Sequence, residues 1–507
     1  MSWREYHELT KHSVESLRRT QHSLDWENMP DPFRHYEGVP VLDLPADPPP
    51  PEAPALALLQ GANGAAQATG GPALLSQLLF YSAAISASKR VPSTGYRYAL
   101  RVNPSSGNLH PTEFHFLTRG LPQWPGGLYH YRPSSHMAEQ RAVGHLDMAA
   151  AGGDAPVVFV LTSIAWREAW KYRDRAYRYC LLDVGHAWQA LALAARALGC
   201  DSFAVGHFPD DEAARRYRFH SDEWPLLMVR LSGKPIPLRA PDSGETAWFG
   251  GKANQLSSQQ VAYPRIEAIH AATKLPEDCG PAPVSEPAPA GSGDLQLCAP
   301  ASSARAFGEV ARTRRSALDF RGGSESMSRA QLSAVLAVTA QPLSCDFGGA
   351  RFVQLYLYAH RIHGLERGVY RYCPGQAELE RIRSGDQRAA AAGLSLGQDL
   401  AGNACVAFSM VGDLDRAVRA HGDRGYRYVH FEAGAVGQRL YLAAEALGLG
   451  ATGIGAFFDD EVHRYLNLDS SGRQVVYHFA IGHPAPDPRV VASDQIRRNS
   501  TTVLNVE

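Results

Sequence analysis

The sequence predicts an α+β fold that occurs twice in tandem, and three observations lead to this prediction. First, the 507-residue chain is too long for one ordinary domain. Second, residues 177–208 align without a gap on residues 426–457, an offset of 249, with 14 identities in 32 positions, against roughly two for unrelated chains. Third, GLYHY at 127–131 recurs as GVYRY at 368–372, an offset of 241. We therefore predict two copies of one domain.

Each copy is expected to contain a buried strand followed by a long helix. Residues 157–165 and 404–412 are short apolar runs bounded by turn residues, which is typical of buried strands. In residues 183–198 apolar side chains recur at helical spacing, and Gly199 is expected to end this helix. The second copy matches, with Gly448 in that place. A glycine-containing apolar run and a further strand follow, so each copy fits an antiparallel-containing sheet with helices packed on it.

The domain boundaries follow from composition. Residues 271–300 are rich in Pro, Gly, Ser and Ala and poor in large apolar residues, as a linker should be. We predict a first domain with an N-terminal extension at 1–270, a linker at 271–300 and a second domain at 301–507.

Composition excludes several classes of protein. Hydrophobic residues make up 45% and charged residues 20%, with a net charge of -1, which is typical of a soluble globular protein and gives no sign of nucleic-acid binding. No apolar run suggests a signal peptide or a membrane span, so we expect a cytoplasmic protein. The seven cysteines form no CxxC pair, so we expect free thiols and no metal site.

Four motifs carry a family resemblance: YHELTKHS at 6–13, PSSGNLHPTE at 104–113, WKYRDRAYRY at 170–179 and GIGAFFDDEV at 453–462. In this order, and over nearly the whole chain, the sequence resembles the nitroreductase superfamily and within it the SagB/ThcOx-type dehydrogenases. The resemblance implies FMN as the cofactor. In that family two protomers share each FMN: one offers a PSSxN segment, and its partner offers an Arg-Ser segment and a glycine-containing loop.

The two copies keep complementary halves of such a site. Copy one has the PSSxN segment, whereas copy two has CDFGG at 345–349 in its place. Copy two has the Arg-Ser segment at 314–316, whereas residues 61–71 of copy one contain no arginine. We therefore predict two nitroreductase-like domains that form a pseudo-two-fold pair, with one hybrid FMN site and a decayed symmetric site. The resemblance implies these cofactor-binding residues: Ser105, Ser106, Asn108, Arg314, Arg315, Ser316, Gly453, Ile454, Gly455, Arg497 and Arg498.

The chemistry of FMN suits these residue types. Guanidinium groups match a phosphate dianion with bidentate, permanently charged hydrogen bonds. Serine and asparagine offer short donors and acceptors for the edge of the flavin ring, and glycines let backbone N–H groups approach closely. The alternatives are that Arg315, Arg497 and Arg498 are surface charges and that SSGN is only a turn. Gly206 and His207 of copy one are expected to be structural relics.

Lys171 and Tyr172 occur once, because copy two has Ala420 and His421 at the same offset. The resemblance implies that this Lys-Tyr pair is catalytic. Dehydrogenation with a flavin requires a base to remove a proton as hydride leaves, and a lysine amine can serve where burial or nearby cations favour its neutral form. The alternative is a surface lysine beside a core tyrosine.

Other repeated residues are expected to be architectural. The triplet Tyr177, Arg178 and Tyr179 occurs in both copies, so the arginine is expected to satisfy buried carbonyl groups. Asp183 and Glu432 also match, and we expect them to orient these arginines. The N-terminal residues through about Asp43 could act as a lid or as a clasp across the junction.

The leading hypothesis is an FMN-dependent oxidoreductase that dehydrogenates an azoline-type heterocycle in a modified peptide or small natural product, with oxygen as the electron acceptor. An NAD(P)H-dependent nitro or quinone reductase is the alternative enzyme. A non-catalytic peptide-binding scaffold is the alternative from another class. We expect a small-molecule or modified-peptide substrate, no nucleic acid, no membrane, and a monomeric pseudo-dimer or a homodimer.

Overall fold

The computed structural model describes residues 1–19, 23–65, 70–148, 155–234, 236, 245–288, 291–348, 351–468 and 472–492. Arg497 and Arg498, two of the predicted FMN ligands, lie outside these residues.

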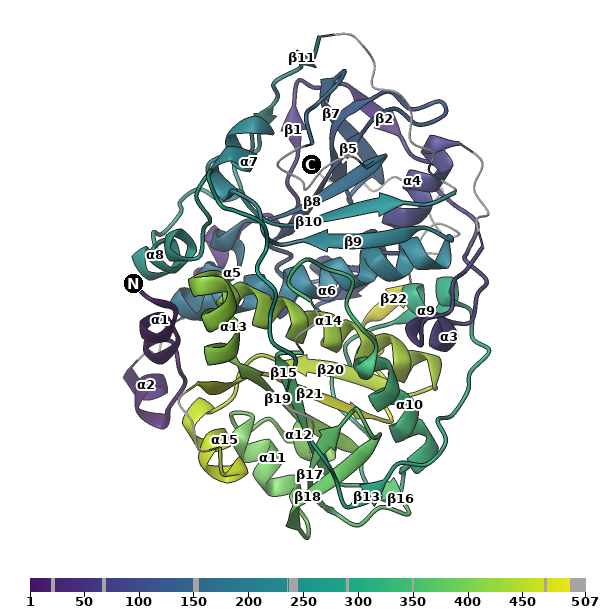
Figure 1. The fold of residues 1–507 in the computed structure, drawn as a ribbon, viewed down its shortest axis with the longest axis vertical. Coiled ribbons are helices and arrows are strands. Elements are labelled where there is room, and N and C mark those ends of the chain that lie inside the picture. Colours follow the sequence, from purple (N-terminus) through teal and green to yellow (C-terminus); the bar gives the residue numbers. More distant parts are fainter. Residues whose placement is uncertain are drawn as a thin grey trace.

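Two antiparallel sheets with the same strand order form the two ends of the molecule (Figure 1). The first has the order β11-β7-β6-β5-β8-β10-β9, with β2 also paired to β7, and the second has the order β13-β18-β17-β15-β19-β21-β20. The first sheet contains β2 (Val41–Asp43), β5 (Thr112–Thr118), β6 (Gly127–Arg132), β7 (Met137–Val143), β8 (Val157–Ser163), β9 (Asp201–Val205), β10 (Trp224–Ser232) and β11 (Ala247–Trp248). The second contains β13 (Leu295–Gln296), β15 (Val353–Ala359), β17 (Gly368–Cys373), β18 (Glu378–Ser384), β19 (Val406–Asp413), β20 (Gly450–Ile454) and β21 (Arg473–Gly482).

The strand register repeats as well. Leu117 of β5 lies opposite Val158 of β8, and Tyr358 of β15 lies opposite Ala407 of β19. Leu117 and Tyr358 are related by the sequence offset of 241, and Val158 and Ala407 are related by the offset of 249. The predicted duplicated α+β fold is therefore confirmed.

Two long helices, α6 (Ala176–Ala197) and α14 (Gly425–Ala446), pack against each other between the two sheets (Figure 1). They cross at Gly185 and Gly434, which are equivalent positions of the two copies. A Cβ atom on Gly185 would lie 2.3 Å from the Phe431 carbonyl oxygen, and one on Gly434 would lie 2.1 Å from that of Leu182. Only glycine permits this approach, so the crossing marks the pseudo-two-fold axis.

The remaining helices surround this centre. In the first half they are α1 (Trp3–Leu9), α2 (Val14–Arg19), α3 (Ala55–Leu59), α4 (Gly71–Phe80), α5 (Ala165–Tyr172), α7 (Asp210–Arg216) and α8 (Pro264–Ala272). In the second half they are α9 (Phe307–Thr313), α10 (Arg329–Ala340), α11 (Arg388–Leu394), α12 (Asp399–Asn403), α13 (Leu414–His421) and α15 (Asp459–Leu466). Short pairs join β1 (Tyr36–Glu37) to β12 (Lys252–Ala253) and β14 (Met327–Ser328) to β16 (Ile362–His363).

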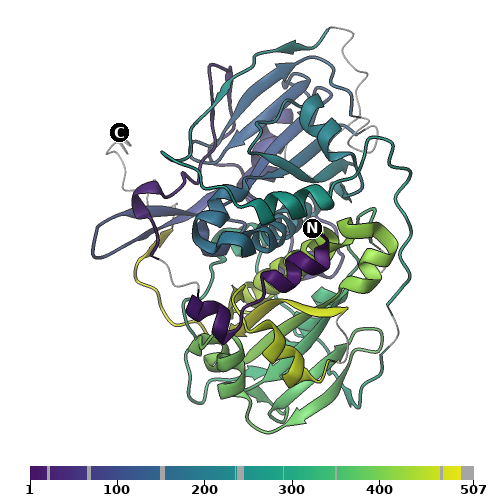
Figure 2. The same ribbon diagram turned by 90° about the vertical axis from the view of Figure 1, so that its left-hand side faces the viewer.

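A hairpin of the first copy is completed by the end of the second. Strands β3 (Ile85–Arg90) and β4 (Arg97–Arg101) form the hairpin, and β22 (Val490–Ala492) pairs with β3. Figure 2 shows the hairpin projecting beside the yellow C-terminal segment. The Lys89 amine lies 2.7 Å from an Asp487 carboxylate oxygen and adds an ion pair to this junction. The two copies are thus interleaved at this point.

The N-terminal helix is held by a buried ion cluster, which we name the Asp459 clasp. The Asp459 carboxylate accepts hydrogen bonds from Arg175 and Arg178, at 3.0 and 2.9 Å. Arg178 also donates to the Thr10 hydroxyl and to the His7 carbonyl. Figure 2 shows α1 lying where the two halves of the molecule meet. Of the two predicted roles for the N-terminal segment, these contacts fit the clasp.

A second cluster, the Asp210 clasp, repeats this arrangement around α8. Asp210 accepts hydrogen bonds from Arg424 and Arg427. Arg427 also donates to the Thr273 hydroxyl and to the His270 carbonyl. The carbonyl role expected for these arginines is correct.

The two clasps show which carboxylates orient the buried arginines, and they draw attention to a short sequence repeat in α1 and α8. Asp183 and Glu432 were expected to orient the arginines, and this is wrong, because Asp459 and Asp210 do so from the opposite copy in each case. His-x-x-Thr-Lys at residues 7–11 recurs at 270–274. This repeat predicts the symmetry of α1 and α8. The domain boundary predicted after residue 270 falls inside α8.

Candidate functional site

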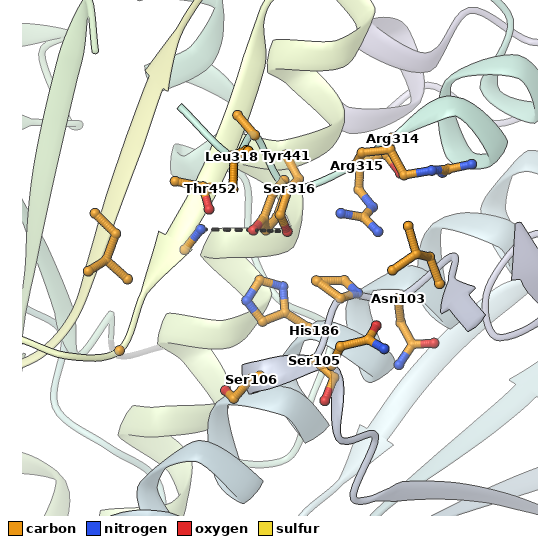
Figure 3. A pocket seen from close by; sticks show the side chains of 18 of the residues that line it. Asn103, Ser105, Ser106, His186, Arg314, Arg315, Ser316, Leu318, Tyr441 and Thr452 are labelled. Atoms are coloured by element: carbon orange, nitrogen blue, oxygen red, sulfur yellow. Dashed lines mark hydrogen bonds between the residues drawn. The ribbon is translucent and has the colours of Figure 1, made fainter. Parts of the chain in front are cut away.

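A cavity of about 730 Å³ lies at the junction and is lined by both copies (Figure 3). This volume is within the range of about 300–1,000 Å³ that is usual for ligand pockets. Every predicted site residue that the structure describes lines this cavity: Ser105, Ser106, Asn108, Lys171, Tyr172, Arg314, Arg315, Ser316, Gly453, Ile454 and Gly455. The structure therefore brings together segments that are far apart in the sequence.

The PSSxN segment forms one wall, and Asp183 of α6 holds it. The Asp183 carboxylate accepts hydrogen bonds from the Ser105 hydroxyl at 2.7 Å, from the Ser106 hydroxyl at 3.0 Å and from the Ser106 backbone N–H. Burial raises the pKa of Asp183 to about 7, although these hydrogen bonds oppose the shift. Asp183 thus orients a loop of the cavity, which explains why its carboxylate does not face Arg178.

Lys171 and Tyr172 end helix α5, and their tips reach this loop at Gly107. A Cβ atom on Gly107 would lie 2.7 Å from the Tyr172 hydroxyl and 3.2 Å from the Lys171 amine nitrogen. Gly107 has a φ of +59°, which also favours glycine. Burial raises the pKa of the Tyr172 hydroxyl well above its usual value, and the charge of Glu168 raises it further. A neutral phenol and an amine therefore face the cavity together.

The two arginines of the Arg-Ser segment are anchored by backbone carbonyl groups. Buried Arg314 donates through Nε to the Val102 carbonyl at 3.0 Å and through Nη2 to the Arg101 carbonyl at 3.2 Å. Arg315 donates to the Ser86 carbonyl at 2.8 Å, among others. Arg315 is thus not the free surface charge of the alternative interpretation. Both arginines tie copy two to the β3–β4 hairpin of copy one.

Several buried polar atoms around the cavity have no hydrogen-bond partner among the described residues. They are Arg101 Nε and Nη1, Asn103 Oδ1, His110 Nδ1 and Arg314 Nη1. Unsatisfied buried polar groups are costly, about 1–3 kcal/mol each, and native proteins contain few of them. The guanidinium groups of Arg101 and Arg314 are donors that suit an anionic ligand, whereas Asn103 Oδ1 is an acceptor.

Sequence reasoning missed a set of polar side chains opposite the PSSxN segment. The Tyr441 hydroxyl lies 2.8 Å from the Ser316 hydroxyl oxygen and accepts a hydrogen bond of 2.8 Å from the Gly453 N–H (Figure 3). His186 Nε2 lies 3.1 Å from the Tyr477 hydroxyl oxygen. The matching positions of the other copy are Ala192 for Tyr441 and Ala435 for His186. These one-sided differences were visible at the offset of 249 and could have identified both residues.

The glycines of the 453–455 loop are required by tyrosine packing. A Cβ atom on Gly453 would lie 1.9 Å from the Tyr477 hydroxyl oxygen, and one on Gly455 would lie 2.4 Å from a ring carbon of Tyr179. Tyr179 also donates a hydrogen bond of 3.0 Å to the Gly455 carbonyl. The loop at 453–455 is therefore held in place by the side chains of Tyr477 and Tyr179.

The symmetric position is filled by side chains of the protein. Phe347, which replaces Ser106 at the offset of 241, is buried and stacks on Tyr428 with ring centroids 4.3 Å apart. Its ring also lies against Gly206, where an added Cβ atom would be 2.6 Å from it. Asp346 accepts hydrogen bonds from the Gly206 and His207 backbone N–H groups at 2.8 and 3.0 Å. Gly206 and His207 therefore have structural contacts here, as expected for relics.

The cysteines, the possible metal ligands and the helix lengths bear on the remaining expectations. All seven cysteines are free thiols. Within the described residues, no group of three or more His, Cys, Asp and Glu side chains is placed to hold a metal ion. Likewise, none of the helices in the described ranges is long and apolar enough to cross a membrane.

The duplicated fold and the shared cavity define a two-copy α+β protein whose junction cavity is lined by residues of both copies. The Nitroreductase family profile matches residues 81–234 and 311–483. The chain belongs to the nitroreductase family, and the predicted resemblance and its tandem form are confirmed.

Known relatives agree with this assignment. A nitroreductase-family protein of Anabaena variabilis, whose crystal structure is known, is 26% identical with a TM-score of 0.74, and the match covers 96% of this chain and 100% of that one. A Methanocaldococcus jannaschii protein named as a nitroreductase is 35% identical over 116 residues, 23% of this chain and 59% of its own length. The Microcin B17-processing protein McbC of Escherichia coli is 28% identical over 146 residues, 26% of this chain and 54% of its own length. The chain thus matches little more than half the length of these two curated relatives.

Proposed function

We propose that this protein is an FMN-dependent oxidoreductase with one active site per chain. The observation that carries the proposal is the junction cavity, where the PSSxN segment of copy one meets the Arg-Ser segment of copy two. Arg101 and Arg314 line this cavity, and their guanidinium groups fit an anionic cofactor, because FMN carries a phosphate dianion. The symmetric position contains Phe347 instead. A stoichiometry of one FMN per chain follows.

The residues that would hold FMN fall into groups by chemistry. Arg314 and Ser316 suit its phosphate and ribityl chain, with Arg315 fixing the segment to the hairpin. Ser105, Ser106 and Asn108 suit the ring edge. The loop containing Gly453, Ile454 and Gly455 offers backbone groups. We also keep Arg497 and Arg498 as proposed ligands on the family resemblance.

The reaction we propose is dehydrogenation of an azoline-type heterocycle in a peptide or small natural product. FMN, when bound, supplies a two-electron acceptor for hydride. Lys171 accepts the proton that the substrate releases, so its amine becomes an ammonium, while Tyr172, a neutral phenol, donates a hydrogen bond to the substrate. The similarity to the E. coli protein whose name describes microcin processing favours a peptide substrate.

A nitro or quinone reductase that takes electrons from NAD(P)H is the second candidate. The 35% identity to a protein named as a nitroreductase favours it. Both candidates use the same cofactor, and they differ in the direction of electron flow. Anaerobic addition of NADPH to the yellow protein distinguishes them: rapid bleaching of the flavin absorbance supports the reductase, and none supports the dehydrogenase.

The first test is to purify the chain, record its visible spectrum and count the flavin released per chain. We expect a yellow protein with about one FMN. A colourless protein that does not take up FMN would leave a peptide-binding scaffold as the better interpretation. Two FMN per chain would contradict the hybrid site.

The second test is Lys171→Ala. Removing a general base typically lowers turnover by about 10²- to 10⁴-fold, and we expect FMN to remain bound. Ala420→Lys, at the matching position of the other copy, is the control and should leave turnover unchanged. Unchanged turnover in Lys171→Ala would reject the base.

A further inference from the structure

A second cavity, of about 650 Å³, lies in the second copy and has no part in the proposed reaction. Linker residues, strands β15, β17, β19 and β21, and helix α13 contribute to its lining. Among the described lining residues, it has none in common with the junction cavity. Its volume is within the range of about 300–1,000 Å³ that is usual for ligand pockets. We name it the Gly291 cavity, after a linker residue in its wall.

The charged groups of the Gly291 cavity are mainly guanidinium groups. Four arginines line it: Arg351, Arg371, Arg416 and Arg473. The one acid among the described lining residues is Asp413, whose Oδ2 lies 3.4 Å from Arg416 Nε and 3.9 Å from Arg473 Nε. Glu380 Oε2 forms an ion pair of 2.5 Å with Arg371 Nε. Positive charge is therefore in excess, and guanidinium groups bind phosphates and carboxylates with paired hydrogen bonds.

Two of these arginines are held in place by backbone carbonyl groups. Arg351 donates through Nη1 to the Thr339 carbonyl at 3.2 Å. Arg416 donates through Nη1 to the Glu286 carbonyl at 2.9 Å. Donors that are positioned before a ligand arrives lose less conformational entropy when it binds.

The first copy has an equivalent of this place, and a pair of matching hydrogen bonds identifies it. Arg167 and Arg416 correspond at the offset of 249. Arg167 donates to the Asp31 carbonyl at 2.8 Å, as Arg416 does to the Glu286 carbonyl. Each of these two acidic residues is followed by a proline. The chain segments at 31 and 286 are therefore equivalent, with an offset of 255.

The first copy fills this place with its own side chains. At the offset of 255, Tyr36 corresponds to Gly291. Tyr36 is buried, its hydroxyl donates to Glu223 at 2.7 Å, and its ring centroid lies 5.3 Å from that of His130. The counterpart of His130 is Arg371, and a Cβ atom added to Gly291 would lie 3.4 Å from Arg371 Nη2. The missing tyrosine side chain thus leaves space beside an arginine.

The charges at this place also differ between the copies. Glu113 corresponds to Gln354 at the offset of 241. The register of β10 on β8 and of β21 on β19 gives an offset of 250 for these last strands, so Glu223 corresponds to Arg473. The first copy therefore balances its buried cations with its own glutamates, whereas the second copy has lost two acids here and gained an arginine.

We propose that the Gly291 cavity binds a small molecule with two or more oxyanion groups, either phosphates or carboxylates. The four arginines come from four separate segments of the second copy, so one ligand with spaced anionic groups can contact more than one of them. Such a ligand takes the place of the tyrosine ring and the two acids of the first copy. The inference does not depend on the proposed oxidoreductase activity.

Isothermal titration of inorganic pyrophosphate and of citrate into the FMN-loaded chain, each measured separately, tests the proposal. We expect at least one of the two probes to bind saturably, with one anion per chain, and the tighter probe shows whether phosphates or carboxylates fit better. Arg473→Glu restores the acid of the first copy and should weaken binding by roughly 10-fold or more. The Arg473 side chain is 51% exposed, so we expect this variant to fold. Arg464→Glu makes the same charge change on α15, outside the cavity lining, and should leave the dissociation constant unchanged.

Two further variants separate this cavity from other sites. Gly291→Tyr fills the cavity as Tyr36 does in the first copy and should abolish binding; the nearest atoms to its Cβ are the side-chain ends of Cys373 and Arg371. Arg314→Gln alters the junction cavity and should leave the affinity for the probe unchanged, even if the chain takes up no FMN. Failure of the proposed cofactor site and failure of the Gly291 cavity are therefore different results.

The proposal would be overturned if neither probe bound saturably, or if Arg473→Glu and Arg464→Glu weakened binding equally. Unchanged binding in Gly291→Tyr would overturn it as well. A loss of binding in Arg314→Gln would assign the anion to the junction cavity instead.

Discussion

The two symmetric positions at the junction differ in what fills them. One is a cavity of about 730 Å³ walled by Ser105, Ser106 and Arg314, and the other contains the stacked rings of Phe347 and Tyr428. An unused cavity between helices would forfeit packing energy, so an aromatic side chain in its place stabilises the fold. The difference shows that a duplicated chain can use one of its two junction positions for packing and the other for a ligand.

A second comparison separates architecture from function. The Asp459 and Asp210 clasps are kept in both copies with equivalent partners. In contrast, Lys171, His186 and Tyr441 are replaced by alanine at the equivalent positions. The clasp residues, which both copies retain, hold the fold together. Lys171, His186 and Tyr441, which only one copy retains, line the cavity.

The largest expected effect comes from breaking one clasp at a time. Asp459→Asn and Asp210→Asn each leave two buried arginines without their counter-ion, so each should lower the free energy of unfolding by about 3–5 kcal/mol. Only Asp459→Asn should also weaken FMN binding, because Arg175 and Tyr179 contact the Gly455 carbonyl of the cavity loop. Denaturant unfolding and FMN titration measure the two effects. Equal FMN affinities in both variants would contradict the link between clasp and loop.

Phe347→Ala tests the filled position. Loss of a buried phenylalanine should lower the free energy of unfolding by about 3–5 kcal/mol, because Phe347 packs on Tyr428 and Gly206. The FMN count should remain at one per chain, since this half of the junction has no Arg-Ser segment. A variant that binds two FMN would show that Phe347 alone blocks a second site.

Arg314→Gln tests the open position. Loss of a charged hydrogen bond costs about 1.5–3 kcal/mol, so FMN should bind roughly 10- to 150-fold more weakly. Asp346→Asn, on the filled side, is the control and should leave the dissociation constant unchanged. Isothermal titration of FMN into the cofactor-free protein gives both values, and an equal loss in the two variants would contradict the assignment.

The smallest effect concerns pH. Burial alone would raise the pKa of Asp459, but Arg175 and Arg178 outweigh it and lower the pKa to about 2. A carboxylate whose pKa is lowered on folding contributes its full stability above the unfolded value near 4 and loses it as the pH falls to 2. We expect the wild-type protein to lose about 2 kcal/mol from this group across that window. Asp459→Asn should lack this part of the acid dependence, and an unchanged pH profile would contradict it.

The duplicated fold and the two halves of the cavity could be predicted from the sequence, because ungapped repeats and short motifs preserve order. The contacts of Asp183 could not, since its neighbours Ser105 and Ser106 lie on a distant segment. Nor did helical spacing indicate that His186 and Tyr441 face the cavity, although a position-by-position comparison of the copies would have. The repeat shared by α1 and α8 was missed because residues 7–11 and 270–274 are not related by the offset of 249 that aligns the two long helices.

The strand β22 has a consequence for how the protein is made. Val490 and Asp487 line the cavity, and β22 pairs with a hairpin of the first copy. Because chains emerge from the ribosome N-terminus first, the β3–β4 hairpin is synthesised about 400 residues before its partner strand. The cavity can therefore close only after nearly the whole chain has been translated, so a ribosome that stalls within the second copy releases a first domain with an unpaired strand edge and no complete site.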